Sequence, residues 1–215
     1  MKGTTGELMA GDLTGRKVAV LATDGVEQVE LTAPWQALKE AHAEVSLISI
    51  KNGTIQGFIH EEKADTFTVD KLAGEVTARD FDALVIPGGV RNTEALRATS
   101  EAVELVRGFM EADKPVAAIC HAPRILVEAG AVQGRTLTSH PEIADEIREA
   151  GGSWVDKQAA VDQRLLTSRK QEDLPAFCGN LIAMLTSAID ERRLDKMVEQ
   201  TFPASDPLPG PISLG

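Results

Sequence analysis

Residues 115–123 read PVAAICHAP, and this stretch decides the fold. Residues 115–119 form a short, nearly unbroken apolar run, which is typical of a strand buried on both faces of a parallel sheet. The run stops at Cys120, and a helical pattern follows to about Ala129, where Gly130 occupies a position that commonly ends helices. A buried strand followed directly by a helix is the unit from which parallel α/β sheets are built.

The same alternation of strand and helix patterns continues in both directions along the chain. Further apolar or β-rich runs are at 17–22, 44–50, 82–86, 135–138, 153–156 and 164–168, and helical patterns are at 27–41, 93–112, 141–150 and 174–189. Pro34 should kink the first of these helices or mark a fresh start there, and residues 53–70 favour short exposed β segments. Alternating strands and helices predict an α/β fold, with a mostly parallel sheet and helices on both of its faces.

The length of 215 residues suits one domain with tails. Residues 1–15 lack periodicity and are interpreted as a flexible N-terminal arm. Residues 16–189 carry the strand and helix patterns and form the predicted α/β domain. Residues 190–215 form a C-terminal extension, and its proline-rich tail from residue 202 excludes a regular helix or a central strand there.

Composition narrows the possible partners and the compartment. The chain has 22 Lys and Arg against 33 Asp and Glu, a net charge of −11, and it contains no basic run, so nucleic acids and anionic membranes are not expected partners. Two cysteines exclude a disulfide-built scaffold and a zinc site with four cysteine ligands. Because no segment has the apolar length of a signal peptide or a membrane span, we expect a cytoplasmic protein in a reducing compartment.

Cys120 is the first candidate for chemistry. Ligands of open parallel sheets bind beyond the carboxyl ends of the strands, and Cys120 lies at such an end, at the start of a helix. The positive end of the helix should favour the thiolate, which is the nucleophilic form, and a sharp strand-to-helix turn exposes the side chain. The alternative is a small cysteine buried in the core. His121 follows directly and can accept a thiol proton, or it can simply pack at the start of the helix.

Two neighbouring segments, 23–30 and 87–94, should meet Cys120 at this edge of the sheet. Gly88 and Gly89 allow backbone N–H groups to approach an oxyanion closely, although they also suit an ordinary turn. Glu27 and Glu30 lie in the first turn of a predicted helix. They either compensate the helix dipole, or one of them reaches the sulfur and is pushed towards its protonated form there.

The sequence gives little support for a metal or a cofactor. His140 could join Cys120 and His121 in a zinc site, but their spacing matches no standard ligand pattern, so we expect no metal. The sequence contains neither of the glycine-rich phosphate-binding motifs G-x-x-x-x-G-K-[ST] and G-x-G-x-x-G, so no nucleotide cofactor is expected. Cys178 follows the apolar spacing of its helix and is interpreted as a core residue.

Several of these blocks resemble one known family. VAAICHAP at 116–123 is similar to the AICHGP element of the PfpI intracellular-protease family, within the ThiJ/PfpI/DJ superfamily, which is related to class I glutamine amidotransferases. GVEQVE at 25–30, FDALVIPGG at 81–89, LTSR at 166–169 and DLPAF at 173–177 resemble it as well, in the same order. The resemblance covers about 16–189 and implies a flavodoxin-like α/β sandwich with three layers.

The resemblance also implies roles for particular residues. Cys120 would be the reactive group on a strained elbow, His121 its base, and Glu30 the carboxyl that hydrogen-bonds the sulfur. The N–H groups of Gly89 and His121 would stabilise an oxyanion. An acid just after the glycine pair would serve the site of an adjacent subunit, and Glu94 corresponds to it, in a segment one residue longer than in the proteases.

Two positions depart from the family pattern. Ala122 replaces the usual glycine and would add a methyl group to the wall of the pocket. His140 stands where many relatives carry a large aromatic residue, and its side chain should line the pocket.

The implied function is that of a stress-response enzyme with a nucleophilic cysteine. The reaction would be protease-like hydrolysis, or glyoxalase or protein deglycase chemistry on a 2-oxoaldehyde such as methylglyoxal. The alternative is a sensor or chaperone that works through oxidation of Cys120, stabilised by Glu30. A third possibility is a binding module whose tail docks on partners. The family further implies a homo-oligomer, either a dimer or a hexamer.

Overall fold

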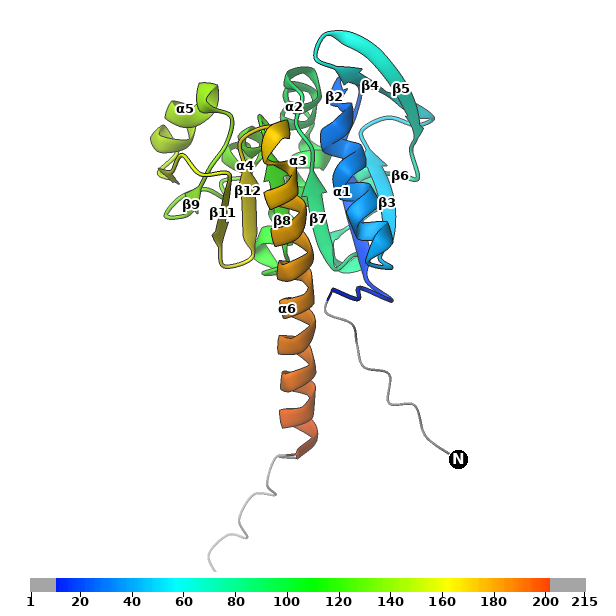
Figure 1. Cartoon of the computed structure of the whole chain (residues 1–215), viewed down its shortest axis with the longest axis vertical. Coiled ribbons are helices and arrows are strands. Elements are labelled where there is room, and N and C mark those ends of the chain that lie inside the picture. Colours follow the sequence, from blue (N-terminus) through cyan, green and yellow to red (C-terminus); the bar gives the residue numbers. More distant parts are fainter. Residues whose placement is uncertain (1–10, 202–215) are drawn as a thin grey trace, which may run out of the picture.

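A sheet of seven strands forms the centre of the structure, a computed structural model that describes residues 11–201 (Figure 1). In spatial order the strands are β11 (Ala159–Asp162), β12 (Leu165–Ser168), β8 (Val116–Ile119), β7 (Ala83–Ile86), β1 (Lys17–Leu21), β3 (Glu44–Ser49) and β6 (Lys71–Leu72). Neighbouring strands run parallel except for β11, which is antiparallel to β12. The predicted, mostly parallel sheet is confirmed.

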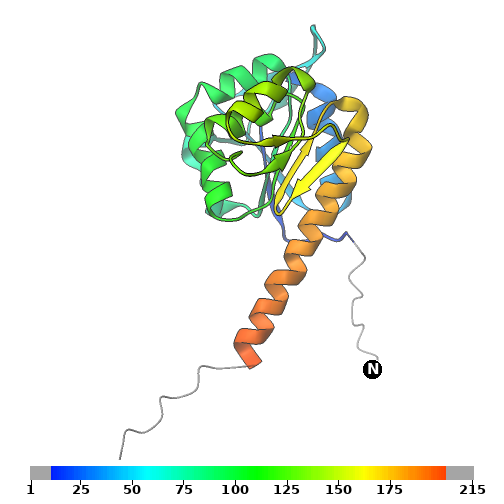
Figure 2. The same cartoon turned by 90° about the vertical axis from the view of Figure 1, so that its left-hand side faces the viewer.

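Helices cover both faces of this sheet, and Figure 2 separates the two layers. One face carries α2 (Val90–Arg97), α3 (Ser100–Glu111), α4 (Pro123–Glu128) and α5 (Ala144–Glu149), and the other carries α1 (Gln28–Glu40) and α6 (Leu174–Thr201). Along β1, Ala19 and Leu21 pack into the first layer while Val18 and Val20 pack into the second, because side chains alternate along a strand. The expected three-layer sandwich is therefore confirmed, and it explains why the inner strands β7 and β8 are apolar throughout.

Two small sheets flank the central one. β2 (Val26–Glu27) pairs with β4 (Thr54–Ile59), which forms an antiparallel hairpin with β5 (Glu62–Thr68), and β9 (Thr136–Leu137) pairs with β10 (Ser153–Trp154). The sequence predicted short exposed segments at 53–70, whereas the hairpin buries Ile55 and Phe58. The hairpin lies beyond the end of β1, where it contributes to the candidate site (Figure 1).

Several helices and strands differ from the predictions. The single helix predicted over 93–112 is two helices, because the backbone becomes extended at Thr99, where its hydroxyl bonds the carbonyl of Ala95. No fresh helix starts at Pro34, because α1 runs continuously through this buried residue. Strand β11 was not predicted, since a four-residue edge strand that is only partly buried has a weak pattern.

The last helix is longer than its prediction. It continues past residue 189 to Thr201, because residues 190–201 contain no glycine or proline and consist mainly of good helix formers. Figure 1 shows α6 extending well beyond the sheet. Residues 1–10 of the predicted arm and the tail 202–215 lie outside the described residues. Within 11–201, no helix combines the length and apolar character needed to cross a membrane.

Candidate active site

A cavity of about 610 Å³ lies beyond the carboxyl ends of the central strands. Its wall combines segments that are far apart in sequence: the turn after β1, the first turn of α1, the tip of the β4–β5 hairpin, and the loops that follow β7, β8 and β12. Cys120, His121, His140, Glu30, Glu27 and Gly89 all line it. This is the place where parallel sheets bind ligands, and the volume suits a small molecule.

Cys120 occupies a sharp turn between β8 and α4. Its φ of 63° lies in the left-handed region, which costs a non-glycine residue about 1–3 kcal/mol. The turn is held from both sides, because the Cys120 N–H donates to the Ser168 carbonyl at 3.0 Å and the Cys120 carbonyl accepts from the His140 N–H at 2.8 Å. The elbow implied by the resemblance is therefore present, and it directs the sulfur into the cavity.

Glu30 lies almost completely buried beside the sulfur. Its Oε2 accepts a hydrogen bond from the Gly88 N–H at 2.8 Å, and its carboxyl group also bonds the Cys120 side chain. Burial raises the pKa of Glu30 to about 7, with a smaller contribution from Glu27, while the Gly88 N–H opposes the shift. A carboxyl with this pKa holds a proton near neutral pH, so Glu30 can act as a proton donor to the sulfur.

The surroundings of Cys120 correct the expectation that the start of the helix favours its thiolate. Burial is the largest influence and raises the pKa of the thiol, and the charge of an ionised Glu30 raises it further. The N–H groups of His121 and Gly89, which donate to the sulfur, oppose both effects. The expected stabilisation by the helix end is outweighed, first because the thiolate would lose its hydration in this buried space and second because it would be repelled by an ionised Glu30. Protonation of Glu30 removes its negative charge and therefore favours formation of the thiolate.

The backbone N–H groups of the two glycines after β7 have different partners. The Gly88 N–H donates to Glu30, whereas Gly89 and His121 supply the N–H groups that face the sulfur. The oxyanion role expected of the glycine pair stays a prediction. Gly89 has a φ of 96°, and a Cβ placed there would clash with the carbonyl of Gly25. Only glycine fits this close backbone approach.

Asn92 fixes this loop, and the sequence analysis missed it. Its buried amide donates to the carbonyls of Pro87 at 2.9 Å and Gly88 at 3.1 Å, and it accepts from the Thr23 N–H at 2.7 Å. The loops after β1 and β7 are thereby tied together beneath the cavity. In the sequence, nothing distinguishes Asn92 from any other polar residue in the first turn of a helix, so its contacts with both loops could not be predicted.

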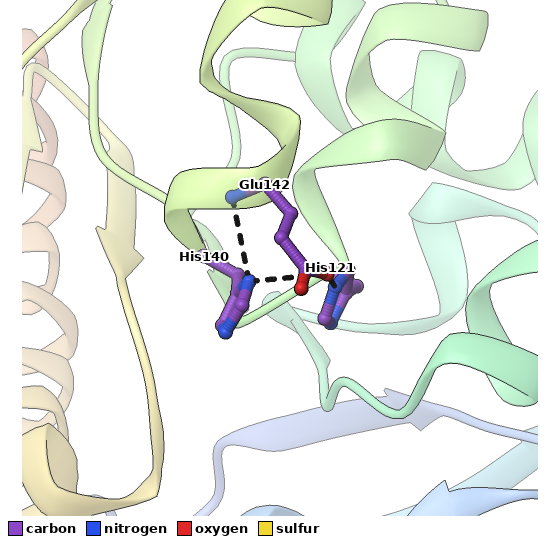
Figure 3. Close-up of side chains that lie close together, drawn as sticks. All are labelled: His121, His140 and Glu142. Atoms are coloured by element: carbon purple, nitrogen blue, oxygen red, sulfur yellow. Dashed lines mark hydrogen bonds and ion pairs between the residues drawn. The ribbon is translucent and has the colours of Figure 1, made fainter.

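His121 contacts the sulfur on one side and a carboxylate on the other. Its Nδ1 lies 3.2 Å from Cys120 Sγ, and its Nε2 lies 3.2 Å from Glu142 Oε2. The ring stacks on that of His140, with centroids 4.5 Å apart and planes inclined by 22° (Figure 3). Burial lowers the pKa of His121, although the hydrogen bond that the Glu142 carboxylate accepts acts to raise it. A neutral imidazole in this position can accept a proton from Cys120.

Glu142 is the second residue that the sequence analysis missed. It lies in a short 3-10 helix, Pro141–Ile143, which follows His140 and turns the carboxylate back over His121 (Figure 3). The hydrogen bond with His121 lowers the pKa of Glu142 and keeps it ionised. In the sequence, Glu142 looks like any acidic residue at the start of a helix, so only the fold reveals this contact.

Glu94 does not line the cavity of its own chain, as far as residues 11–201 show. It pairs with Arg124 at 2.7 Å and with Arg97 at 3.0 Å. The role expected from the resemblance, in the site of an adjacent subunit, stays a prediction.

Glu27 and Ala122 complete the predicted set. Glu27 lines the cavity and accepts from the His60 N–H at 3.1 Å, while its other oxygen is buried without a hydrogen-bond partner among the described residues. The methyl group of Ala122 packs in the core rather than on the pocket wall, which corrects the expectation that it restricts the cavity.

Comparisons with known proteins show which family and fold this chain is similar to. The model of the DJ-1/PfpI family matches residues 16–184. A deglycase of Pyrococcus abyssi is 41% identical over 169 residues, which cover 79% of this chain and 99% of that protein. General stress protein 18 of Bacillus subtilis is 40% identical over 173 residues, covering 80% and 98% of the two chains. The structure of Schizosaccharomyces pombe DJ-1 shares the fold, with a TM-score of 0.70 and 20% identity over 82% of this chain and 97% of that one.

Proposed function

This chain belongs to the DJ-1/PfpI family, and we propose that it is a cysteine-dependent deglycase or glyoxalase that acts on 2-oxoaldehydes and on the adducts they form with amines. One observation carries the proposal. The Cys120 sulfur lines a cavity of small-molecule size and is held between a protonatable carboxyl, an imidazole and two backbone N–H groups. These are the groups that addition of a thiol to a carbonyl requires.

The first step is attack of the Cys120 sulfur on the aldehyde carbon. A sulfur–carbon bond forms, the π electrons of the carbonyl move to oxygen, and the proton held by Glu30 or His121 neutralises that oxygen to give a hemithioacetal. The N–H groups of His121 and Gly89, which face the sulfur, are placed to stabilise the developing oxyanion.

The second step moves a proton between two carbons. His121 or Glu30 removes the hydrogen from the carbon bonded to sulfur, and a proton is returned to the neighbouring carbon. The former aldehyde carbon is oxidised and its neighbour is reduced, so no outside oxidant is needed. The product is a thioester of a 2-hydroxy acid. Water then attacks the thioester, the sulfur–carbon bond breaks, and the thiol is restored with release of the acid.

Adducts of 2-oxoaldehydes with amines react through the same steps. In a hemiaminal, the carbon that sulfur attacks also carries the amine nitrogen. Sulfur displaces that nitrogen, the carbon–nitrogen bond breaks, and the amine leaves with a proton. Proton transfer and hydrolysis then proceed as before, and the net change is release of a free amine and a 2-hydroxy acid at the expense of one water.

Glu142 acts as a positioning residue in this scheme. Its carboxylate bonds His121 Nε2 and leaves Nδ1 facing the sulfur. A reducing compartment such as the cytoplasm suits the reaction, because the thiol has to remain free. We also propose that copies of the chain assemble next to the cavity, where Val90 on its rim is 50% exposed and Ile59 beside it is 53% exposed.

The test compares wild type with Cys120→Ser, using Cys178→Ser as the matched control. The assays measure 2-hydroxy acid formed from methylglyoxal and amine released from methylglyoxal-treated N-acetyl-lysine. We expect Cys120→Ser to lose activity at least about 100-fold, because it lacks the nucleophile, and Cys178→Ser to retain it. Equal turnover by Cys120→Ser would contradict the proposal.

Two further assays separate the alternatives. Hydrolysis of unmodified peptides by wild type, without turnover of methylglyoxal, would favour a protease instead. If wild type turns over neither substrate but Cys120 gains oxygen at low peroxide, the protein is an oxidation sensor.

A further inference from the structure

We propose that His121, His140 and Glu142 form a binding site for a divalent transition-metal ion such as Zn²⁺ on the wall of the cavity. Each residue offers one ligand atom, and the three atoms all lie within 4.8 Å of one another (Figure 3). This site goes beyond the proposed function, because the reaction above is derived from the side chains alone.

The separations between the ligand atoms suit one small ion. Zinc binds histidine nitrogen and carboxylate oxygen at about 2.0–2.2 Å, and tetrahedral geometry then places its ligand atoms about 3.4 Å apart. Glu142 Oε2 lies 3.2 Å from His121 Nε2 and 3.6 Å from His140 Nδ1. The two ring nitrogens lie within 4.8 Å of each other, and the stacked rings have to turn so that both nitrogens face the ion. Rotation of the His140 ring, which is partly exposed, can provide that change.

The backbone holds the two histidines in place before any ion binds. The His140 N–H donates to the carbonyl of Cys120, the residue before His121, at 2.8 Å. The two rings stack with centroids 4.5 Å apart, and Pro141 starts the 3-10 helix that carries Glu142. The backbone therefore fixes where the two histidines lie, and only their rings and the exposed Glu142 side chain have to be ordered when an ion binds.

The ligand set indicates which ions should bind. Two imidazoles and one carboxylate suit Zn²⁺, Co²⁺, Ni²⁺ or Cu²⁺, whereas Mg²⁺ and Ca²⁺ prefer a shell of oxygens. The neighbouring Arg124 does not leave an uncompensated positive charge beside the ion, because it pairs with Glu94 at 2.7 Å and with Glu146 at 2.8 Å. Three protein ligands leave a fourth position for water or for the oxygen of a bound molecule.

The sequence could not predict this set. The zinc site considered there combined His121 and His140 with Cys120, and it matched no standard spacing. In the fold, the third ligand is instead Glu142, and the sulfur lies on the opposite side of the His121 ring, next to Nδ1. The loop after β9 brings together residues that no local motif connects.

The test measures Zn²⁺ binding by isothermal titration calorimetry in the full chain carrying Cys120→Ser and Cys178→Ser, so that no thiol contributes. The same protein is titrated with Co²⁺, whose visible absorption reports tetrahedral coordination. Glu142→Gln and His140→Phe are then added to this background. His42→Gln, which removes an exposed histidine just after the C-terminal end of α1, is the matched control.

We expect one Zn²⁺ per chain and the absorption of tetrahedral Co²⁺. Glu142→Gln and His140→Phe should each weaken binding at least about 10- to 100-fold, the loss typical even of residues that only support a ligand, and His42→Gln should leave it unchanged. Because Glu142 is exposed, its replacement is not expected to disturb folding. Absence of one-to-one binding, or equal affinity in Glu142→Gln and the background protein, would overturn the proposal.

Discussion

Glu30 should make the stability of the protein depend on pH in an unusual direction. The group is buried beside Cys120, and this burial is the largest cause of its raised pKa. Replacing Glu30 with Gln keeps the shape and the acceptor for the Gly88 N–H but removes the ionisable group. The difference in stability between wild type and Glu30→Gln therefore isolates the cost of ionising this carboxyl.

The magnitude follows from the two pKa values. The pKa of Glu30 changes from 4.5 in an exposed carboxyl to about 7 in the folded protein. At about 1.4 kcal/mol for each pH unit, the difference corresponds to about 3 kcal/mol. Because the folded-state pKa is raised, the stabilisation is fully present below pH 4.5 and is lost as the pH rises through about 7. Between pH 4.5 and about 7, the free energy of unfolding of wild type should therefore fall by about 3 kcal/mol relative to that of Glu30→Gln.

The assay is urea unfolding of both proteins at pH values from about 5 to 8. Glu40→Gln serves as the control, because it removes an exposed carboxyl from the other end of α1 and should leave the wild-type curve nearly unchanged. The same comparison in a Cys120→Ser background should retain most of the effect, since burial rather than the thiol is its main cause. The reasoning would be refuted if the stability of wild type, measured relative to that of Glu30→Gln, stayed constant or rose with pH.

Three other substitutions test the geometry of the site, each by urea unfolding. Gly88→Ala should destabilise the protein by about 1–3 kcal/mol, because the new Cβ would clash with Glu30 and lie 2.7 Å from the Cβ of Cys120; an unchanged midpoint would show that the loop can shift freely. Cys120→Gly should be about 1 kcal/mol more stable than Cys120→Ala, because glycine adopts a φ of 63° without strain; the reverse order would exclude strain at the elbow. Asn92→Leu should cost about 2–4 kcal/mol, because it leaves the buried Thr23 N–H and Pro87 carbonyl unpaired and removes one of the two hydrogen bonds to the Gly88 carbonyl; a loss below about 1 kcal/mol would show that water or backbone shifts replace these bonds.

The sequence predicts the parts of the structure that local pattern controls. Apolar runs such as 115–119 and 82–86 locate the central strands, since a strand buried on both faces has no polar alternation. The strand end at Cys120 locates the site, because ligands of parallel sheets bind there. The family resemblance also identifies Glu30, which lies 90 positions away in the sequence and yet bonds the same sulfur.

What the sequence does not predict depends on contacts between distant segments. Asn92 and Glu142 look like ordinary polar residues near helix starts, and their roles arise only when the loops after β7, β8 and β9 meet. The raised pKa of Cys120 depends on burial and on a second acidic group nearby, whereas the local pattern shows only the start of a helix. The break at Thr99 depends on one backbone turn, which apolar periodicity does not register.

Trapping the sulfur–carbon bond tests the central claim most directly. Wild type is mixed with methylglyoxal and quenched with acid after short intervals, and its peptides are analysed by mass spectrometry, which distinguishes Cys120 from Cys178. We expect an adduct on Cys120 that forms before the 2-hydroxy acid appears and disappears as the substrate is consumed. Undiminished turnover with no adduct on Cys120, or with this thiol blocked beforehand, would contradict the assignment of Cys120 as the nucleophile.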